Sequence, residues 1–381
     1  MTARPLSWVT ISKANIVHNV STLRRIIGPE RVYCAVVKSN AYGHGMKETG
    51  KLLVDAGADW LGVNALFEAA ELKKVGITVP IYVMGYIPLE DLEEAVGLGV
   101  HFVVYNLETL QKLATVTSRL GKPAYTHLKV ETGNYRQGVM REDFPVFFQL
   151  YRSNPDIRLE GVATHFANIE DTTDHSYARK QIEAFSELVT EVTKAGFKPE
   201  YRHCANSAAT ILFPDTYFNF VRTGVANYGL WPSETTYISA LQEHKAIELK
   251  PILMWKTRIA QIKKVPAGSY VGYGCSYKTT HESRLAVLPV GYYDGYVRKY
   301  SNSAYVLICG KRAPVRGRVA MNMTVVDVSD IPEAALEDEV VLLGSQGEEK
   351  ITAEQLAGFA ETINYEVTTR IIERVERRVV D

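Results

Sequence analysis

Short apolar segments alternate with amphipathic ones over most of the first 240 residues of this 381-residue chain. Runs such as VYCAVVK (32–38), WLGVN (60–64) and IYVMG (81–85) are each followed by a helix-like stretch. Segments that are apolar along their whole length are typical of parallel strands covered on both faces. Roughly eight strand–helix units of this length predict a (β/α)8 TIM barrel. An open doubly wound sheet would favour a G-x-G-x-x-G after the first strand, and the sequence has none there.

The pattern changes after Trp231-Pro232, where strand-like segments follow one another closely with turn residues between them. Only one strong helix is indicated there, in ITAEQLAGFAETI, with Thr352 as a candidate N-cap and Glu354 in its first turn. This second part of the chain is therefore expected to be mainly β.

The sequence thus predicts an α/β chain of two domains. We expect the (β/α)8 barrel domain over residues 1–240 and the mainly-β C-terminal domain over residues 241–381. A strand at about residues 6–12 is a candidate to join the second domain.

The charge balance and hydropathy exclude several classes of function. Lys+Arg and Asp+Glu both number 43, which argues against binding nucleic acid through bulk charge. No apolar run reaches the roughly 18 residues of a membrane-spanning helix. The N-terminus lacks the apolar core of a signal peptide, so we expect a cytoplasmic protein with no membrane partner.

The four cysteines, Cys34, Cys204, Cys275 and Cys309, are widely spaced and form no C-x-x-C pair. In a chain of this length they are expected to be buried or free thiols. The pair His203-Cys204 has no second pair of ligands at a suitable spacing, so no metal site is expected.

Lys38 ends the first apolar run and precedes a glycine-rich turn that carries hydroxyl groups. In a barrel this position lies at the carboxyl ends of the strands, where barrel enzymes perform their chemistry. Partial burial would lower the pKa of the amine, and a neutral amine can form a Schiff base with an aldehyde. A lysine here can also simply extend into solvent, but the turn that follows favours a chemical role.

The segment AVVKSNAYGHG (35–45) resembles the pyridoxal-phosphate attachment motif of alanine racemases, the barrel-type enzymes that use this cofactor. The resemblance implies that Lys38 holds pyridoxal 5'-phosphate covalently and that the Tyr42 hydroxyl contacts its phosphate. His44 is interpreted as a residue of the helix start rather than a ligand.

Further family motifs follow in order along most of the chain: THFAN, HCANSAATILFP and VRTGVANYGLWPS. They imply a stacking or network role for His165, and place His203 behind an arginine that faces the pyridine nitrogen, Arg222. The resemblance implies the cofactor-binding residues Lys38, Tyr42, His165, Asn206, Ser207, Arg222, Gly224 and Val225, the last two through their backbone. Taken alone, Arg222 could equally be a structural ion-pair partner, and His165 an ordinary barrel histidine.

An arginine at the pyridine nitrogen has a chemical consequence. A carboxylate there would keep the nitrogen protonated and make the ring a strong electron sink. Arginine can only donate, so it holds the nitrogen unprotonated. The unprotonated ring delocalises the negative charge of the carbanion only weakly. This suits a short-lived carbanion that is reprotonated at the same carbon.

Racemisation needs one base on each face of the cofactor plane. Lys38 is expected to serve one face and Tyr273, in a segment that matches the family's second catalytic base, the other. An ordinary tyrosine has a pKa of about 10 and needs cationic help to act as a phenolate. By resemblance, Tyr273 and Met321 reach the site from a partner subunit, which implies a homodimer with a shared active site.

The resemblance also implies substrate-binding residues. Arg136 lies near the substrate carboxylate, Met321 supplies a backbone contact, and Tyr292 lies near the entrance. Lys129 matches a lysine that is carbamylated in some members and orients the arginine. Together these residues imply an isomerase that interconverts L- and D-alanine, in D-alanine biosynthesis for peptidoglycan precursors.

Two departures from the family leave the substrate open. Asn322 replaces the carboxylate of the usual Cys-Met-Asp-Gln run, and Glu373 falls near a position that is aromatic in many members. One reading is a racemase for alanine. The alternative is a broader racemase on the same fold, acting on serine or on a basic amino acid attracted by Glu373.

Two other classes of function remain on related barrels. A non-catalytic protein of pyridoxal-phosphate homeostasis usually lacks a β domain of this size. A decarboxylase of the same architecture favours a carboxylate at the pyridine nitrogen and a cysteine as second acid, whereas this chain has Arg222 and Tyr273.

Overall fold

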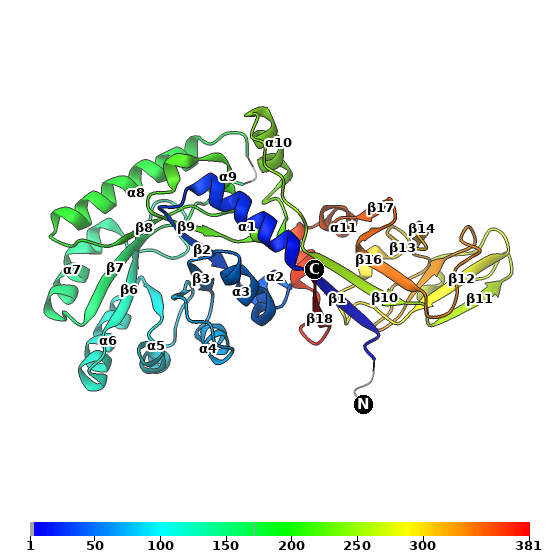
Figure 1. Ribbon diagram of the computed structural model, residues 1–381, viewed down its shortest axis with the longest axis horizontal. Coiled ribbons are helices and arrows are strands. Elements are labelled where there is room, and N and C mark those ends of the chain that lie inside the picture. The colour runs from blue at the N-terminus through cyan, green and yellow to red at the C-terminus, as the bar shows by residue number, and fades with distance from the viewer. Residues whose placement is uncertain (1–3, 171) are drawn as a thin grey trace. The chain divides into compact units, whose positions relative to one another are not determined.

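The computed structural model describes residues 4–170 and 172–381, which form two compact units (Figure 1). The barrel unit consists of Ile16–Ser39 and Thr49–Lys250. The β unit consists of Met1–Asn15, Asn40–Glu48 and Pro251–Asp381. The segment that begins at Asn40 thus belongs to the β unit, while Lys38 and Ser39 belong to the barrel unit.

The barrel unit is built on a sheet of eight parallel strands in the order β8-β7-β6-β5-β4-β3-β2-β9. The backbone N–H of Arg222 donates to the carbonyl of Ala205, 3.1 Å away, and so links β9 to the segment after β8. The strands are β2 (Val32–Val36), β3 (Trp60–Val63), β4 (Ile81–Val83), β5 (His101–Val104), β6 (Ala124–Lys129), β7 (Ile157–Ala163), β8 (Tyr201–His203) and β9 (Phe220–Thr223).

Helices follow the strands and cover the outside of this sheet (Figure 1). They are α1 (Lys13–Ile27), α3 (Met46–Asp55), α4 (Leu66–Lys74), α5 (Leu92–Leu98), α6 (Leu107–Leu120), α7 (Phe144–Ser153), α8 (Ser176–Lys194), α9 (Ser207–Leu212) and α10 (Glu234–Gln242). The short element α2 (Lys38–Tyr42) is a single left-handed turn rather than one of these covering helices. Local signals set their ends: the Asn106 side chain accepts the Thr109 N–H at the start of α6, and Gly121 ends the helix in a left-handed conformation. Shorter 3-10 turns are η1 (Leu89–Asp91), η2 (Arg141–Asp143), η3 (Pro214–Thr216), η4 (Val225–Tyr228), η5 (Tyr273–Cys275) and η6 (Arg298–Tyr300).

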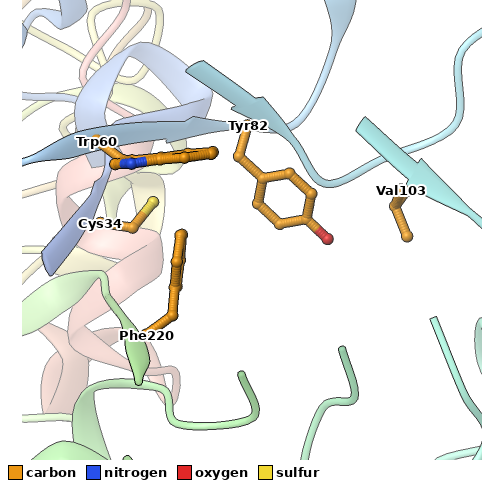
Figure 2. Packing of buried hydrophobic residues seen from close by; sticks show 5 residues of the cluster. All are labelled: Cys34, Trp60, Tyr82, Val103 and Phe220. Carbon is orange, nitrogen blue, oxygen red and sulfur yellow. The ribbon is translucent and has the colours of Figure 1, made fainter. Parts of the chain in front are cut away.

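The interior of the barrel is packed with side chains. Alternate residues of a strand point to opposite faces, and in β6 the Thr126 hydroxyl lies 2.9 Å from the Tyr151 hydroxyl of the covering helix α7. Its neighbour His127 points the other way, toward the rings of the interior. Figure 2 shows a cluster inside the barrel with one residue from each of five strands: Cys34, Trp60, Tyr82, Val103 and Phe220. The barrel is therefore a filled core rather than a pore.

The β unit contains two sheets. Seven strands form one sheet in the order β14-β13-β16-β10-β1-β18 with β17 beside β16, and the other has the order β11-β12-β15. The N-terminal strand β1 pairs antiparallel with β10 and parallel with β18. The strands are β1 (Ser7–Ser12), β10 (Leu253–Arg258), β11 (Gln261–Val265), β12 (Ser283–Leu288), β13 (Tyr305–Ile308), β14 (Lys311–Pro314), β15 (Thr324–Asp327), β16 (Glu339–Gln346), β17 (Glu349–Ile351) and β18 (Glu376–Val380).

The helix expected in the β unit is present as α11 (Ala353–Ala360), and Thr352 is its N-cap, as predicted. The Thr352 hydroxyl accepts the Gln355 N–H, and the Gln355 side chain accepts the Thr352 N–H in return. A second helix, α12 (Asn364–Thr369), was not predicted. It has only six residues, too short for a helical period to be recognised in the sequence.

The predicted fold class, a (β/α)8 barrel with a mainly-β second part, is confirmed. Within the residues described, no helix has both the length and the apolar character needed to cross a membrane. The four cysteines are free thiols; Cys34 and Cys204 are buried, and Cys275 and Cys309 are exposed.

Candidate active site

Many of the sequence-predicted residues gather at the carboxyl ends of the barrel strands, where the active sites of such barrels lie. Lys38 follows β2, Lys129 ends β6, His165 follows β7, Asn206 and Ser207 follow β8, and Arg222, Gly224 and Val225 lie in or just after β9. The fold therefore brings together, in one unit, residues that are up to 187 positions apart in the sequence (38 to 225).

Lys38 lies in an environment that disfavours its charged form. Burial lowers the pKa of this amine, and the nearby guanidinium groups of Arg136 and Arg222 lower it further. The carboxylates of Glu68 and Glu170 oppose the shift without reversing it. A larger share of Lys38 is therefore the neutral, nucleophilic amine than for a lysine in water.

The turn after Lys38 has an unusual backbone. Four consecutive residues, Ser39 to Tyr42, have φ between 52° and 55°, a left-handed turn that costs about 1–2 kcal/mol per residue outside glycine. Side chains compensate for this cost: the Asn40 carbonyl oxygen accepts the Met46 N–H at 2.8 Å, and Glu68 accepts the Ser39 N–H at 2.6 Å. The turn is therefore held in place from both ends.

His44 helps to hold the same turn. Its Nδ1 atom lies 2.8 Å from the carbonyl of Ala41, and burial lowers its pKa to about 4. It lies two residues before α3 begins and orders the turn, rather than capping the helix. From the C-terminal segment, Arg377 donates to the Gly43 carbonyl at 2.8 Å, and the Tyr365 ring lies 5.9 Å from the Tyr42 ring.

Lys129 is the second buried amine of the site. Its Nζ donates to the Gln137 side chain at 2.9 Å. Burial, followed by the guanidinium groups of Arg222 and Arg136, lowers its pKa to about 7. Arg136 itself is exposed, in the loop that joins Lys129 to Gln137. Arg136 is therefore close enough to Lys129 to disfavour the charge on its amine.

Arg222 is a buried cation without a carboxylate partner among its recorded bonds. Its Nη1 contacts His203 Nδ1 in a short hydrogen bond, and its Nη2 donates to the carbonyls of Thr164 at 2.8 Å and Cys204 at 3.3 Å. All three partners are neutral acceptors. The described residues therefore show Arg222 bonded to neutral acceptors, one of which is His203, rather than to a carboxylate.

Ser207 and Asn206 lie beside the turn after β9. The Ser207 hydroxyl oxygen accepts the N–H of Gly224 at 2.8 Å and of Ala226 at 3.4 Å. With both lone pairs engaged, the hydroxyl proton is what Ser207 can still offer, and it suits an acceptor such as a phosphate oxygen. Asn206 accepts the Ala209 N–H and donates to Glu170 at 2.7 Å.

A cavity of about 140 Å³ opens beside these residues. It is lined by His165, Phe166, Ala167, Asn168, Ile169, Glu170 and Asn206. The pKa of His165 lies well below its usual value because the imidazole is buried and because Arg222 is close. The ring is therefore neutral at physiological pH.

The remaining predicted residues belong to the β unit and are exposed. The exposed fractions are 73% for Tyr273, 54% for Met321 and 41% for Tyr292. The Tyr292 N–H donates to the Ala320 carbonyl, which brings the Tyr292 and Met321 segments side by side. A Cβ on Gly274 would lie 2.7 Å from the Arg318 guanidinium. The Tyr273 segment therefore lies beside Arg318, in the connection that also carries Met321.

Sequence reasoning missed several residues of the site. Glu68 and Glu170 modulate the pKa of Lys38, and Arg377 binds the turn after it. His127 and His101 continue the contacts of His203 into the barrel. For the two histidines, a signal was available in the sequence: a polar residue within a strand that is buried on both faces needs a hydrogen-bond partner inside the barrel.

The comparisons with known proteins show which family the chain resembles. The family description "Alanine racemase, N-terminal domain" matches residues 11–232, and "Alanine racemase, C-terminal domain" matches residues 252–379. An alanine racemase of Leptospira interrogans is 40% identical over 377 residues, which cover 98% of this chain and 96% of the relative.

Two solved structures extend the comparison. Alanine racemase from Bacillus anthracis with bound L-Ala-P has a TM-score of 0.93 and 34% identity, covering 100% of this chain and 96% of that one. Alanine racemase from Bartonella henselae with covalently bound pyridoxal phosphate has a TM-score of 0.85 and 27% identity, covering 99% and 100%.

A parallel barrel with buried amines at its strand ends, joined to a mainly-β unit, defines the class of this protein: with these matches it is an amino-acid racemase, an isomerase. More closely, the chain belongs to the alanine racemase family.

Proposed function

We propose that this chain interconverts L- and D-alanine with pyridoxal 5'-phosphate attached to Lys38, and that Lys38 and Tyr273 are the two bases. The observation that carries the proposal is the electrostatic state of the site. Two partly buried amines and two guanidinium groups lie near one another at the carboxyl ends of the strands, and both amines have lowered pKa values.

The residues present fit this cofactor. Lys38 is a buried amine with a lowered pKa, as attachment of an aldehyde requires. Ser207 can donate to a phosphate oxygen. Two N–H groups of Arg222, Nε–H and one on Nη1, have no recorded acceptor in the described residues and suit an unprotonated ring nitrogen. By resemblance, Tyr42 and the backbone of Gly224 and Val225 are also assigned to the phosphate.

When bound, the cofactor supplies an electron sink that makes the α-hydrogen of the amino acid acidic. The protein's own residues then move the proton. We assign Lys38 to the removal or delivery of the proton on one face of the α-carbon and Tyr273 to the other face. Proton removal on one face and delivery on the other inverts the configuration.

The substrate carboxylate is assigned to Arg136, with Lys129 acting on that arginine. The amine of Lys129 has a pKa of about 7, so at slightly alkaline pH it is neutral and can react with CO2. The product is a carbamate and a released proton, so an amine beside Arg136 that is cationic below about pH 7 becomes an anion. This change would remove repulsion and orient the guanidinium toward the substrate.

We also infer that the active protein is a homodimer. Tyr273 and Met321 expose 73% and 54% of their surface in the single chain. A catalytic phenol must work in a site from which bulk water is excluded. A second copy of the chain would supply the missing cover, with Tyr273 and Met321 of each copy completing the other copy's site.

The proposal is tested by incubating the purified holoenzyme with L-alanine in deuterated water. We expect D-alanine with deuterium at the α-carbon, and neither CO2 nor pyruvate. Formation of CO2 as the main product would instead identify a decarboxylase. No turnover by a protein that nevertheless binds the cofactor would indicate a role in cofactor homeostasis.

Two exposed residues support a second candidate, a racemase of broader range. Asn322 and Glu373 are both exposed in the β unit, and they differ from the family by the loss and the gain of a carboxylate. A turnover profile over L-alanine, L-serine, L-lysine and L-arginine separates the two. Preference for a basic substrate that disappears in Glu373→Gln would establish the broader function.

A further inference from the structure

A file of three histidines runs through the barrel behind Arg222. His203 Nε2 lies 2.7 Å from His127 Nδ1, and His127 Nε2 lies 3.3 Å from His101 Nδ1. The three residues come from β8, β6 and β5, and His101 is the first residue of its strand. The file therefore extends from the arginine near the carboxyl ends of the strands toward their amino ends.

Arg222 determines where each imidazole carries its proton. A guanidinium group can only donate, so His203 Nδ1, which contacts Nη1 of Arg222, must accept. His203 then carries its proton on Nε2 and donates to His127 Nδ1. By the same step His127 is protonated on Nε2 and donates to His101 Nδ1, which leaves the proton of His101 on Nε2 as well.

The same order of bonds keeps all three rings neutral. Protonation of any Nδ1 would place an N–H group against another N–H donor. Burial acts in the same direction: the pKa values of His203 and His127 lie well below the usual range, and that of His101 is lowered to about 4. The charged groups that act on the file are themselves cationic: Arg222, Lys129 and Lys73.

Packing fixes the rings in this order. A Cβ on Gly161 would lie 2.2 Å from His127 Nδ1, so only glycine leaves room for the ring at this position of β7. Centroids of the Tyr82 and His127 rings are 4.6 Å apart, and those of Trp60 and His101 are 4.4 Å apart. Two of the aromatic residues that surround the file, Trp60 and Tyr82, are labelled in Figure 2. No ring of the file can turn over without displacing its neighbours.

We propose that His127 and His101 are positioning residues for Arg222: with His203 they form a file of neutral imidazoles, each protonated on Nε2, that holds the guanidinium group as a pure donor toward the cofactor ring. This proposal rests on the proposed function, because Arg222 matters to the reaction only if the cofactor is bound. It assigns roles to two histidines for which the sequence motifs gave none.

The direct test is the tautomeric state of the histidines in the holoenzyme labelled with ¹⁵N-histidine. We expect three imidazoles protonated on Nε2, with Nδ1 accepting a hydrogen bond, and no change of state across the neutral pH range. His101→Gln and His127→Asn assign the signals. A proton on Nδ1 of any of the three, or a charged ring among them, would overturn the proposal.

A matched pair of variants tests the positioning role. In His127→Asn the side-chain oxygen can still accept the His203 proton, whereas the similarly shaped His127→Leu cannot. We expect His127→Leu to raise the dissociation constant for pyridoxal 5'-phosphate by about tenfold, the effect of one unsatisfied buried N–H, and to shift the absorbance of the bound cofactor. His127→Asn should stay within about threefold of the parent chain.

Equal affinities and spectra in the parent chain and both variants would remove the positioning role. If His127→Leu does not fold, the tautomer measurement on the parent chain still decides the proposal. Failure of the proposed function is recognised separately: the deuterium experiment would then give no labelled D-alanine, while the tautomers of the file could still be as stated.

Discussion

The two units carry their candidate residues in opposite ways. In the barrel unit, Lys38, Lys129 and Arg222 lie in or near the interior and act on one another's charge. In the β unit, Tyr273 and Met321 stand on exposed loops and expose more than half of their surface. The candidate residues of the barrel unit are thus enclosed by the fold of a single chain, while those proposed in the β unit are exposed side chains.

This difference indicates how the two sets of residues would be made ready for catalysis. Neutral, closely held amines arise from burial, which a barrel supplies as it folds. An exposed tyrosine is neither desolvated nor fixed, so its contribution depends on a surface that arrives from outside. Substitution of Lys38 or Arg222 in the barrel unit should therefore affect the bound cofactor, and substitution of Tyr273 should affect proton transfer.

The largest effect is expected for Lys38→Ala. It removes both the attachment point and one base, so turnover should fall by more than about 10⁴-fold. The covalent link that borohydride would trap should also be absent, measured by the mass of the reduced protein. Lys51→Ala is the control, because Lys51 is an exposed helix residue paired with Asp55. Retention of a reducible link in Lys38→Ala would place the attachment elsewhere.

Tyr273→Phe tests the other side of the comparison. Loss of one general acid–base group should lower racemisation by about 10²–10⁴-fold in both directions. Cofactor affinity and absorbance should stay unchanged, since Tyr273 is not among the residues assigned to the cofactor. Tyr270→Phe is a matched control, as Tyr270 is 60% exposed in the same loop. Equal turnover in the two variants would remove Tyr273 from the mechanism.

The fold was predictable where strands are apolar along their length. The segment 60–64 is an example. Strand β3 is buried throughout, so its sequence is apolar on both faces and predicts a strand of a covered parallel sheet. The left-handed turn from Ser39 to Tyr42 was not predictable, because no glycine marks its four residues. Its conformation is imposed by contacts from Glu68 and Arg377, which are distant in the sequence.

Arg222→Glu tests whether the residue at the cofactor's ring nitrogen must be a hydrogen-bond donor. A carboxylate can only accept, so His203 would have to donate from Nδ1, and the proton order of the histidine file should reverse. We expect a new long-wavelength absorbance of the bound cofactor during turnover and a loss of racemisation of about 10²-fold or more. Arg222→Lys is the control that keeps the charge. An unaltered spectrum in Arg222→Glu would contradict the placement of this arginine at the ring nitrogen.

The site was predictable from motifs only to the level of single residues. Lys38 and Arg222 were identified by the segments around them, but their shared electrostatics could not be. The bond between His203 and His127 joins residues 76 positions apart, and nothing local in either strand indicates it. Hydrogen-bond partners across a closed barrel depend on which strands become neighbours, and this is a property of the whole fold.

Lys129 provides a pH test of the barrel side. Its pKa of about 7 means that the amine is neutral above that pH and charged below it, because burial and the nearby Arg222 and Arg136 disfavour the charge. With bicarbonate present, the mass of the intact protein should show added CO2 that increases as pH rises through about 7 and is lost on acidification.

Lys129→Ala should carry no such modification, and its turnover should fall by about tenfold through misplacement of Arg136. Lys122→Ala, an exposed lysine before the same strand, is the control. A modification that persists in Lys129→Ala, or one that does not vary with pH, would refute the assignment.

The smallest effect is expected from a change that touches only the β unit's stability. Thr352→Ala removes the capping hydroxyl of α11 and leaves the Gln355 N–H without that acceptor, which should lower the free energy of unfolding by about 1 kcal/mol. Because α11 lies in the β unit, the unfolding midpoint followed by β-unit probes should fall. The midpoint at which the cofactor absorbance is lost should not change, since a chain with two units need not unfold in one step.

Thr190→Ala on the exposed face of α8 is the control, since its hydroxyl bonds within its own helix. If Thr352→Ala released the cofactor at the same denaturant concentration at which the β unit unfolds, the two units would be one cooperative structure, and the division between a self-sufficient barrel half and a dependent β half would have to be abandoned.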